Sequence, residues 1–368
     1  MAATLMGGTP YKQRVKLRDI ADATGLSLAA VSLALNGKTG ISPANRQRVV
    51  DAAHSLNYER PYPRPRSAPP CISVIIERLP VDIAKDPFNR PILEGLEAAA
   101  RPHGYRVAVE FVGPDDHPDA GPWARGASTA GAIILGGGDL SPRWVQAAAA
   151  AALPVVMLDH VVPGLDLPAV VSDNLGGAHT MTKYLLEQGH RRIGYIRGPS
   201  KYWTLSERLA GFLLALQQHG VWPDPDLMPP RLSHADVKGY HEMRRLLDLP
   251  KPPTAVLAVS DQAAVGAYRA TQERGLSIPG DISIAGFDDI ETGRALNPPL
   301  TTVHVPGEEM GRVAFERLRL LMAGDEAQLA RQIRWTIPTS LVIRGSVARR
   351  DAVTARPRDG ERTRTDRQ

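Results

Sequence analysis

The hydrophobic and polar positions near the N-terminus predict two short helices joined by a tight turn. Ile20 and Ala21 begin an apolar face, Gly25 interrupts it, and Val31 resumes it at helical spacing. Glycine accepts the positive φ of such a turn without steric cost. The stretch 17–36 is therefore predicted to be a helix-turn-helix, although an ordinary helical hairpin in a globular domain fits the same spacing.

Capping residues support this interpretation and predict a third helix. Ser27 stands where a side-chain oxygen would accept a hydrogen bond from the free amides of the second helix. Ser42 and Pro43 form the same kind of helix start, and Val49 and Ala53 follow at helical spacing. Three short helices in a row can close a small core.

A helix-turn-helix binds DNA by placing the first turn of its second helix in the major groove. The side chains expected to face the bases are Leu28, Ala29, Ser32 and Leu33. Leucine and alanine can only contact thymine methyl groups and exclude water, whereas Ser27, Ser32 and Asn36 can bond phosphates or base edges.

From Cys71 onward, short apolar strands alternate with amphipathic helices. The first series has strands at 72–76, 106–111, 131–135 and 154–158 and helices at 91–101 and 141–152. The second has helices at 176–187, 205–218, 235–247 and 262–274 and strands at 192–196, 255–259 and 282–286. A strand at 301–305, a helix at 307–322 and strands near 333–343 follow. This alternation predicts two α/β lobes built on parallel sheets with right-handed crossovers.

The charge distribution separates the ends of the chain from its middle. The chain has 368 residues, 43% of them hydrophobic, which is enough for two or three domains. The net charge is +5, but residues 11–66 hold ten Lys/Arg against four Asp/Glu, and residues 67–346 hold 27 against 31. Such a split is typical of a phosphate-binding head on a neutral or acidic body, although a merely solvated basic face would have the same composition.

Several classes of function lack their sequence signals. The single cysteine, Cys71, excludes a disulfide framework and a zinc cluster. No secretion signal and no membrane-spanning run is found, so a cytoplasmic protein without membrane contact is expected. The glycines 136–138 lack the spacing of a dinucleotide fingerprint, and hydrolase and metalloprotease motifs are missing. We therefore expect no enzyme, no cofactor and no metal.

Residues 59–70 are predicted to be a linker because their prolines prevent a helix and favour an extended polyproline conformation. Arg60, Arg64 and Arg66 are interleaved with these prolines. They could form a strip that enters a narrow minor groove, or a stiff basic spacer that contacts phosphates without specificity. The tail 347–368 carries seven arginines and little apolar content, so it is expected to be disordered.

Carboxylates recur where the predicted strands end. In α/β sheets ligands bind beyond the carboxyl ends of strands, but an Asp there can equally cap the next helix. Carboxylates accept hydroxyl hydrogens, arginine donates in a fork, and an aromatic ring offers a flat apolar face, a combination suited to a sugar or other polyol. The expected effector-binding residues are Phe88, Asp159, Asp173, Trp203, Arg208, Asp261 and Asp288. For Trp203, burial in a lobe core is an equally good account.

The head resembles the headpiece of lactose-repressor-type (LacI/GalR) transcription factors. The resemblance rests on Leu17-Arg18-Asp19-Ile20-Ala21, Gly25-Leu26-Ser27, Val31-Ser32, Asn36-Gly37, Ile41-Ser42, Arg46, Val49 and Leu56-Asn57-Tyr58, and it continues to about Ser346. It implies a three-helix helix-turn-helix head followed by an α/β two-lobed periplasmic-binding-protein-like sensor domain, with three strands crossing between the lobes. The linker departs from the family pattern, because it lacks the leucine and the helix-forming residues of the usual hinge helix.

The resemblance also sharpens the roles of individual residues. Asp86-Pro87-Phe88 is similar to a family segment that touches the effector, Arg208 in ERLAGF matches an effector-bonding arginine, and Asp288 in GFDD matches a sugar-binding aspartate. Asp159 and Asp261 match rim positions that vary in role. With Leu17, Ser42, Asn45 and Tyr58, the expected DNA-contacting set also includes Ser27, Leu28, Ala29, Ser32, Leu33, Asn36, Arg60, Arg64 and Arg66.

The predicted domains are a flexible N-terminus at 1–14, the DNA-binding domain at 15–58, the linker at 59–70, the sensor at 71–346 and the tail at 347–368. Within the sensor, lobe 1 takes about 71–171 and 301–327, and lobe 2 about 172–300 and 328–346.

The predicted protein is a sequence-specific transcriptional regulator, a repressor at the nucleoid in the cytoplasm, that binds double-stranded operator DNA. The resemblance implies that it does so as a homodimer through the sensor domain. A small polar effector, a sugar, would bind between the lobes, change their angle and alter the placement of the heads. The alternative is a solute-binding protein without DNA regulation, which would need a secretion signal and has no use for residues 17–36.

Overall fold

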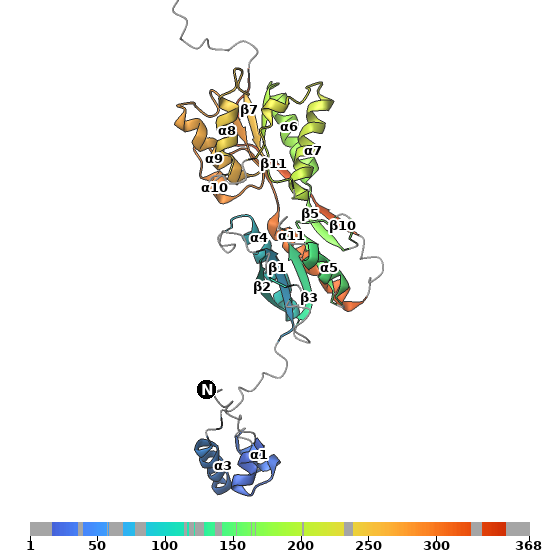
Figure 1. The fold of residues 1–368 in the computed structure, drawn as a ribbon, viewed down its shortest axis with the longest axis vertical. Helices are drawn as coiled ribbons and strands as arrows, with labels where there is room; N and C mark the ends of the chain where they lie inside the picture. Colours follow the sequence, from blue (N-terminus) through green and yellow to red (C-terminus); the bar gives the residue numbers. More distant parts are fainter. Residues whose placement is uncertain are drawn as a thin grey trace, which may run out of the picture. The chain divides into compact units, whose positions relative to one another are not determined.

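The structure is a computed structural model, and the residues that it describes fall into two units, 1–68 and 69–368 (Figure 1). The described residues are 17–35, 40–56, 58, 69–77, 86–113, 116–117, 121, 129–136, 142–151, 153–162, 164–165, 167–200, 202–231, 238–324 and 333–350. The predictions for the N-terminus 1–14, for linker residues 59–68 and for tail residues 351–368 lie outside this set.

The first unit is a three-helix head, as the sequence predicts. Its helices are α1 (Leu17–Thr24), α2 (Leu28–Leu35) and α3 (Pro43–Ser55). Gly25 has φ +64° in the turn between α1 and α2, which confirms its predicted role. The Ser27 Oγ accepts from the Ala30 amide at 3.2 Å and the Ser42 Oγ from the Asn45 amide at 3.3 Å, so both predicted caps are confirmed.

The head core is small and forms where the apolar faces of the three helices meet. Ile20, Val31 and Val49 are fully buried, one from each helix, and three alanines fill the gaps between them. Outside this core, the Arg48 Nη2 donates to the Thr24 carbonyl at 2.9 Å and so ties α3 to the end of α1. The α1–α2 pair is thereby held in a fixed crossing that leaves the start of α2 uncovered.

The first lobe of the second unit is built on a six-stranded parallel sheet with the order β10-β5-β4-β3-β1-β2. Its strands are β1 (Cys71–Glu77), β2 (Arg106–Val112), β3 (Thr129–Leu135), β4 (Val155–Leu158), β5 (Ala169–Ser172) and β10 (Arg334–Ile337). Its helices are α4 (Asn89–Ala100), the short 3-10 helix η2 (Arg101–His103), α5 (Pro142–Ala150) and α11 (Gly307–Ala323).

Both faces of the inner strands of this sheet are buried, which explains why β1, β3, β4 and β5 are almost continuously apolar, whereas the edge strands β2 and β10 are partly exposed. Along β1, Ile72, Val74 and Ile76 point into the core that includes α4 and α11. Ile75 points the other way, into a second core with Trp144 of α5. Because successive side chains of a strand point to opposite faces of the sheet, β1 contributes apolar side chains to the cores on both faces.

The second lobe has a three-stranded parallel sheet, β6-β7-β8, extended by β9 and β11. The strands are β6 (Ile193–Ile196), β7 (Ala255–Ala258), β8 (Ser283–Ala285), β9 (Thr302–His304) and β11 (Ser340–Val342). The helices are α6 (Asn174–Glu187), α7 (Trp203–Gln218), η5 (Pro225–Leu227), α8 (Tyr240–Leu247), α9 (Asp261–Glu273) and α10 (Glu291–Arg294). In Figure 1, α6 and α7 lie on one side of β7, and α8 and α9 lie on the other.

The chain passes three times between the lobes. It leaves the first sheet after β5 to form α6, returns after β9 to form α11, and leaves again between β10 and β11. The expected number of crossings is thus present. β10, within the stretch 328–346 that the sequence analysis assigned to the second lobe, instead pairs with β5 at the edge of the first sheet.

Two further boundaries differ from the sequence predictions. In the described chain α8 begins at Tyr240 rather than at 235, because Gly239 has φ +79° and a Cβ there would lie 2.1 Å from the Ala263 carbonyl oxygen. Residues 347–350, expected in the disordered tail, are ordered against the second lobe. The Ala348 amide donates to the Ser283 Oγ at 3.1 Å, and the Arg350 amide donates to the Gln188 carbonyl at 2.8 Å.

No helix in the described ranges is long and apolar enough to span a membrane.

Two glycines set the close approach of α4 and α11. A Cβ at Gly311 would lie 2.1 Å from the Ile92 carbonyl oxygen, and one at Gly95 would lie 2.1 Å from the Glu308 carbonyl oxygen. We predict that Gly311→Ala lowers the free energy of unfolding by about 3 kcal/mol, because backbone must move to admit the methyl group. Urea denaturation followed by circular dichroism measures this.

Gly104→Ala is the matched control. Gly104 has φ +76° and no atom within 4 Å of a Cβ, so the substitution costs only backbone strain, about 1 kcal/mol. Equal losses for the two variants would show that the helices do not need the glycine contact.

Candidate functional site

The first turn of α2 is exposed on the surface of the head. Leu28 is 50% exposed, which is unusual for a leucine, and Ser27 and Ala29 are also exposed. Val31 and Ala34, on the opposite side of α2, are buried against the other helices. The helix is thus anchored by one face and presents its N-terminal turn to solvent, as insertion into a groove requires.

The other residues expected at the DNA interface have mixed environments. Ser32, Leu33, Leu17 and Tyr58 are half-buried, and Leu17 and Tyr58 pack against the head core. Ser42 caps α3, and the Asn45 Oδ1 accepts from the Arg48 Nη1 at 3.4 Å. Asn36, Arg60, Arg64 and Arg66 lie outside the described residues.

A cavity of about 230 Å³ lies between the two lobes of the second unit. Four of the seven residues expected to bind effector line it, namely Phe88, Asp159, Arg208 and Asp288. Phe88 precedes α4 and Asp159 follows β4, so both come from the first lobe. Arg208 lies on α7 and Asp288 follows β8 in the second lobe. The sequence rule that placed ligands beyond strand ends therefore brings residues of both lobes to one cavity.

Arg208 is the central group of the second-lobe wall. Its Nη1 donates to the Asp288 Oδ1 at 2.9 Å and to the Val259 carbonyl at 2.8 Å, while its Nε donates to the Asn174 Oδ1 at 2.8 Å. The guanidinium lies 3.8 Å from the centre of the Phe287 ring. With only 3% of the residue exposed, the arginine is held rigidly and fixes the direction of the Asp288 carboxylate.

Asp288 is held in a rare backbone conformation. Its φ is +119° and that of Asp289 is +63°. Burial raises the pKa of the Asp288 carboxyl, and the positive charge of Arg208 opposes this effect. The GFDD segment thus turns sharply after β8 and aims one carboxylate at the cavity.

Asp159 faces the cavity from the first lobe with less support. Its Oδ1 is buried and has no hydrogen-bond partner in the described part of the chain. Burial raises the pKa of its carboxyl to about 7, against the lowering effect of Arg208. Leaving a buried oxygen without a partner is unfavourable, so a hydrogen-bonding group that a ligand brought to Asp159 would be stabilised there. Gly136 lies beside it, and a Cβ there would meet the Asp159 carbonyl oxygen at 3.1 Å.

Three of the expected effector residues do not line the cavity. The Asp173 Oδ1 accepts from the Gly176 amide at 2.8 Å, so Asp173 caps α6 and the capping alternative is correct. Trp203 begins α7, and the Arg334 guanidinium lies 4.9 Å from the centre of its ring. The Asp261 carboxylate accepts from the Thr302 Oγ1 at 2.6 Å and from the Ile290 amide at 3.0 Å, so both oxygens are used within the second lobe.

Several cavity residues were missed by the sequence analysis. Arg197 follows β6 just as Asp288 follows β8, so the strand-end rule could have found it. Lys238 and Glu242 flank the start of α8 and carried no such signal, because their position depends on the turn at Gly239. His160 also lines the cavity, and its burial lowers the pKa of the imidazole. The described residues hold no cluster of His, Cys, Asp and Glu suited to a metal.

The chain matches two family models in the same order as its two units. Residues 16–61 match the bacterial regulatory proteins of the lacI family, and residues 182–347 match a periplasmic binding protein-like domain. The chain is 35% identical over 333 residues to the HTH-type transcriptional repressor CytR of Escherichia coli (strain K12). The aligned region covers 90% of this chain and 95% of CytR.

Solved structures agree over nearly the whole length. The complex of the transcriptional regulator CelR with cellobiose has a TM-score of 0.66 and 28% identity, and covers 90% of this chain and 100% of its own. The lac repressor dimer bound to operator and the anti-inducer ONPF has a TM-score of 0.65 and 25% identity. This match covers 91% of this chain and 100% of the lac repressor chain. The chain therefore belongs to the LacI family of bacterial regulatory proteins and is a DNA-binding transcriptional regulator rather than an enzyme.

Proposed function

We propose that a small polar effector, a sugar, binds in the cavity between the lobes and controls the affinity of this regulator for its operator. The observation that carries the proposal is the arrangement of Asp288 and Asp159 on opposite walls, with Asp288 fixed by Arg208 and the Asp159 Oδ1 without a partner in the described residues. Carboxylates in such positions accept hydroxyl hydrogens from a polyol.

The remaining lining suits the same class of ligand. Phe88 and Tyr202 offer aromatic surface from opposite lobes, and Arg197 and Gln262 offer polar groups. Pockets for small polar molecules combine such apolar surface with a few oriented polar groups. The CelR structure to which the chain is similar holds a disaccharide, cellobiose, which supports a sugar here without naming it.

For the head, the proposal is that the first turn of α2 reads operator DNA. Leu28 and Ala29 would contact base edges, Ser27, Ser32 and Leu33 would flank them, and the other residues predicted from sequence would contact phosphates and the minor groove. One three-helix head contacts few phosphates, so tight specific binding calls for two heads. The lac repressor structure to which the chain is similar is a dimer on operator, which supports a homodimer here. In this proposal the homodimer forms through the sensor domain.

Coupling between the sites follows from the two-lobed cavity. An effector that touches Phe88 and Asp159 on one side and Asp288 on the other favours one angle between the lobes. In a dimer this angle sets the spacing of the heads and therefore the fit to two half-sites. Repression is the proposed outcome, in the cytoplasm and at the nucleoid.

The domain boundaries of the sequence analysis are kept in this proposal with two changes. The head spans 15–58 and the sensor begins at 71, as before. β10 is assigned to the first lobe because it pairs with β5, and the sensor extends to residue 350 because 347–350 contact the second lobe.

A solute-binding protein without DNA regulation is the second candidate. The two-lobed unit alone would suit it, but it leaves unexplained a capped three-helix head whose exposed leucine lies on the first turn of α2. The following three tests separate the two functions and examine the cavity.

Leu28→Glu is expected to reduce binding to operator DNA more than a hundredfold, because an acidic side chain would face the phosphates and bases. Genomic fragments retained by the wild type in a gel-shift selection at about 100 mM salt supply the DNA. Val50→Glu is the matched control, since Val50 is 43% exposed on α3 and receives the same change. Retention of the fragments by both variants would show that the first turn of α2 does not read the DNA, and a wild type that retains no fragment would favour the solute-binding function.

At least one compound in a thermal-shift panel of three sugars, D-ribose, D-galactose and cellobiose, and one nucleoside, cytidine, is expected to raise the melting temperature of the wild type. A ligand at a hundred times its Kd stabilises the folded state by about 2.7 kcal/mol. Asp288→Asn should abolish the ligand-induced shift because the fixed acceptor loses its charge. Asp226→Asn, an exposed aspartate on η5, should keep it. A shift that survives in Asp288→Asn would move the site elsewhere.

The raised pKa of Asp159 predicts how stability varies with pH in the empty protein. Its folded pKa of about 7 lies above the ordinary value of 3.8, so the unfolded chain releases this proton first and the folded state loses stability as pH rises toward 7. Asp159→Asn removes this loss. The free energy of unfolding of the variant should rise by roughly 2 kcal/mol relative to that of the wild type as the pH goes from 5 to 8, which urea unfolding measures. A constant difference across that range would show that Asp159 is ionised throughout.

A further inference from the structure

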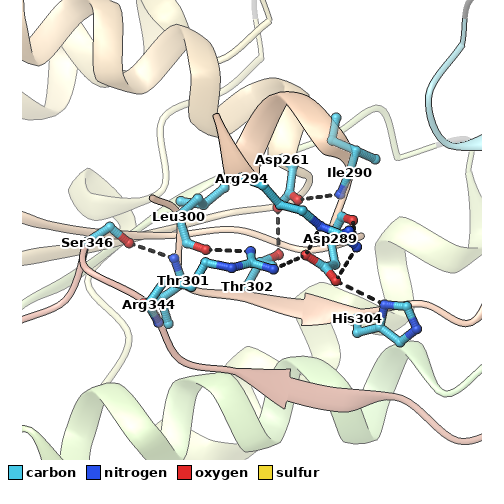
Figure 2. A network of polar contacts seen from close by, with 10 residues as sticks. All are labelled: Asp261, Asp289, Ile290, Arg294, Leu300, Thr301, Thr302, His304, Arg344 and Ser346. Carbon is cyan, nitrogen blue, oxygen red and sulfur yellow. Dashed lines mark hydrogen bonds and ion pairs between the residues drawn. The ribbon is translucent and has the colours of Figure 1, made fainter. Parts of the chain in front are cut away.

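A polar network lies beside the cavity, between the loop after β8 and the crossing strand β9. Figure 2 shows its members, drawn from α9, the loop at 289–290, α10, β9 and the segment at 344–346. Two aspartates, Asp261 and Asp289, accept most of its hydrogen bonds, and neither lines the effector cavity. The strand-end pattern of the sequence predicts effector binding by Asp261, but its carboxylate is used within this network.

Asp261 joins three segments through one carboxylate. It begins α9, and its residue is fully buried. Its Oδ1 accepts from the Thr302 hydroxyl on β9, and its Oδ2 accepts from the Ile290 amide in the loop. A Cβ at Gly286 would lie 2.2 Å from the Asp261 Oδ1, so the glycine of GFDD makes room for this carboxylate.

Asp289 joins the same loop to β9 and to the C-terminal segment. Its carboxylate receives hydrogen bonds from Arg294 of α10 and from Arg344, and contacts the Nδ1 of His304 on β9 at 3.1 Å. Burial alone would raise the pKa of Asp289, but the two arginines hold it below its ordinary value. Arg344 also donates to the Leu300 carbonyl at 2.8 Å, just before β9.

These contacts hold a backbone that would not persist by itself. Positive φ values at two successive aspartates are strained for residues other than glycine and need support from their surroundings. The Asp288 amide donates to the Val303 carbonyl at 2.8 Å, and the Val305 amide donates to the Asp288 carbonyl at 3.3 Å. Asp288 is therefore attached to β9 through its backbone and through both neighbouring carboxylates.

β9 leads directly into the first lobe. Pro306 follows it, and α11 then begins at Gly307 beside Pro91 and Ile92 of α4. Glu308, in the first turn of α11, has its carbonyl against Gly95 of α4. The residues just before α4 include Phe88, which lines the cavity from the first lobe. The path from Asp288 to the opposite wall is thus continuous.

We propose that Asp261 and Asp289 are positioning residues that clamp the Asp288 loop to β9, so that the cavity carboxylate and the strand crossing to the first lobe move as one unit. The role of the clamp in effector response rests on the proposed binding of effector at Asp288. The clamp itself does not, because its hydrogen bonds are all made between residues of this chain.

Hydrogen exchange followed by mass spectrometry on the full-length, ligand-free protein tests the clamp. Thr302→Val keeps the shape of the side chain and removes the hydroxyl that Asp261 binds. Exchange of the amides at 286–290 and at 302–305 should become about tenfold faster, as expected for one lost hydrogen bond to a charged group. The increase should be similar in the two segments. Exchange in β6 should not change. Asp289→Asn should have the same paired effect, and Thr302→Ser should restore slow exchange.

Thr271→Val is the matched control. Thr271 is also fully buried, but its hydroxyl donates to the Ala267 carbonyl within α9. Faster exchange in only one of the two segments, in neither, or equally with Thr271→Val would overturn the clamp. Cellobiose and D-ribose binding by Thr302→Val provides a separate arm. If Thr302→Val speeds exchange in both segments but even the wild type binds neither sugar, the clamp is supported and only the proposed effector is contradicted.

Discussion

The buried Arg208–Asp288 ion pair is the interaction on which the sensor depends. A charge removed from water is tolerated only when it is paired and its remaining hydrogen-bonding groups are satisfied. Arg208 meets this condition by binding Asn174 at the start of α6, Val259 at the end of β7 and Asp288 after β8. Three elements far apart in the sequence must therefore converge before the cavity wall exists.

The lobes and the region between them are stabilised by different physics. Each lobe has a sheet covered by apolar helices, and close glycine contacts hold α4 against α11. The lobes also contact each other through polar groups, such as Arg334 of β10 with Glu207 of α7. Close-packed cores resist deformation, whereas polar contacts can be exchanged for others or for water at small net cost. Motion driven by a ligand is thereby directed to the crossings.

The head follows a simpler principle. Its core is only a few apolar side chains, so caps at Ser27 and Ser42 and the bond from Arg48 to the end of α1 contribute a large share of its order. Its surface then leaves a leucine and an alanine exposed on α2, which are poorly suited to solvent but well suited to thymine methyl groups. Membership of the LacI family agrees with this division between a small DNA-reading unit and a larger sensing unit.

The sequence by itself determined the elements and their class. Apolar periodicity, Gly25 and the serine caps are local signals, and they defined the head and the alternating lobes because helices and strands form over short stretches. It also placed Asp159 and Asp288 at strand ends, where the structure has them line the cavity. Only the tertiary structure decided that Asp173 caps a helix and that Asp261 binds Thr302, since capping, positioning and ligand-binding aspartates look identical in sequence. The partner of β10 and the order of residues 347–350 likewise depend on contacts with segments more than sixty residues away, which no local pattern encodes.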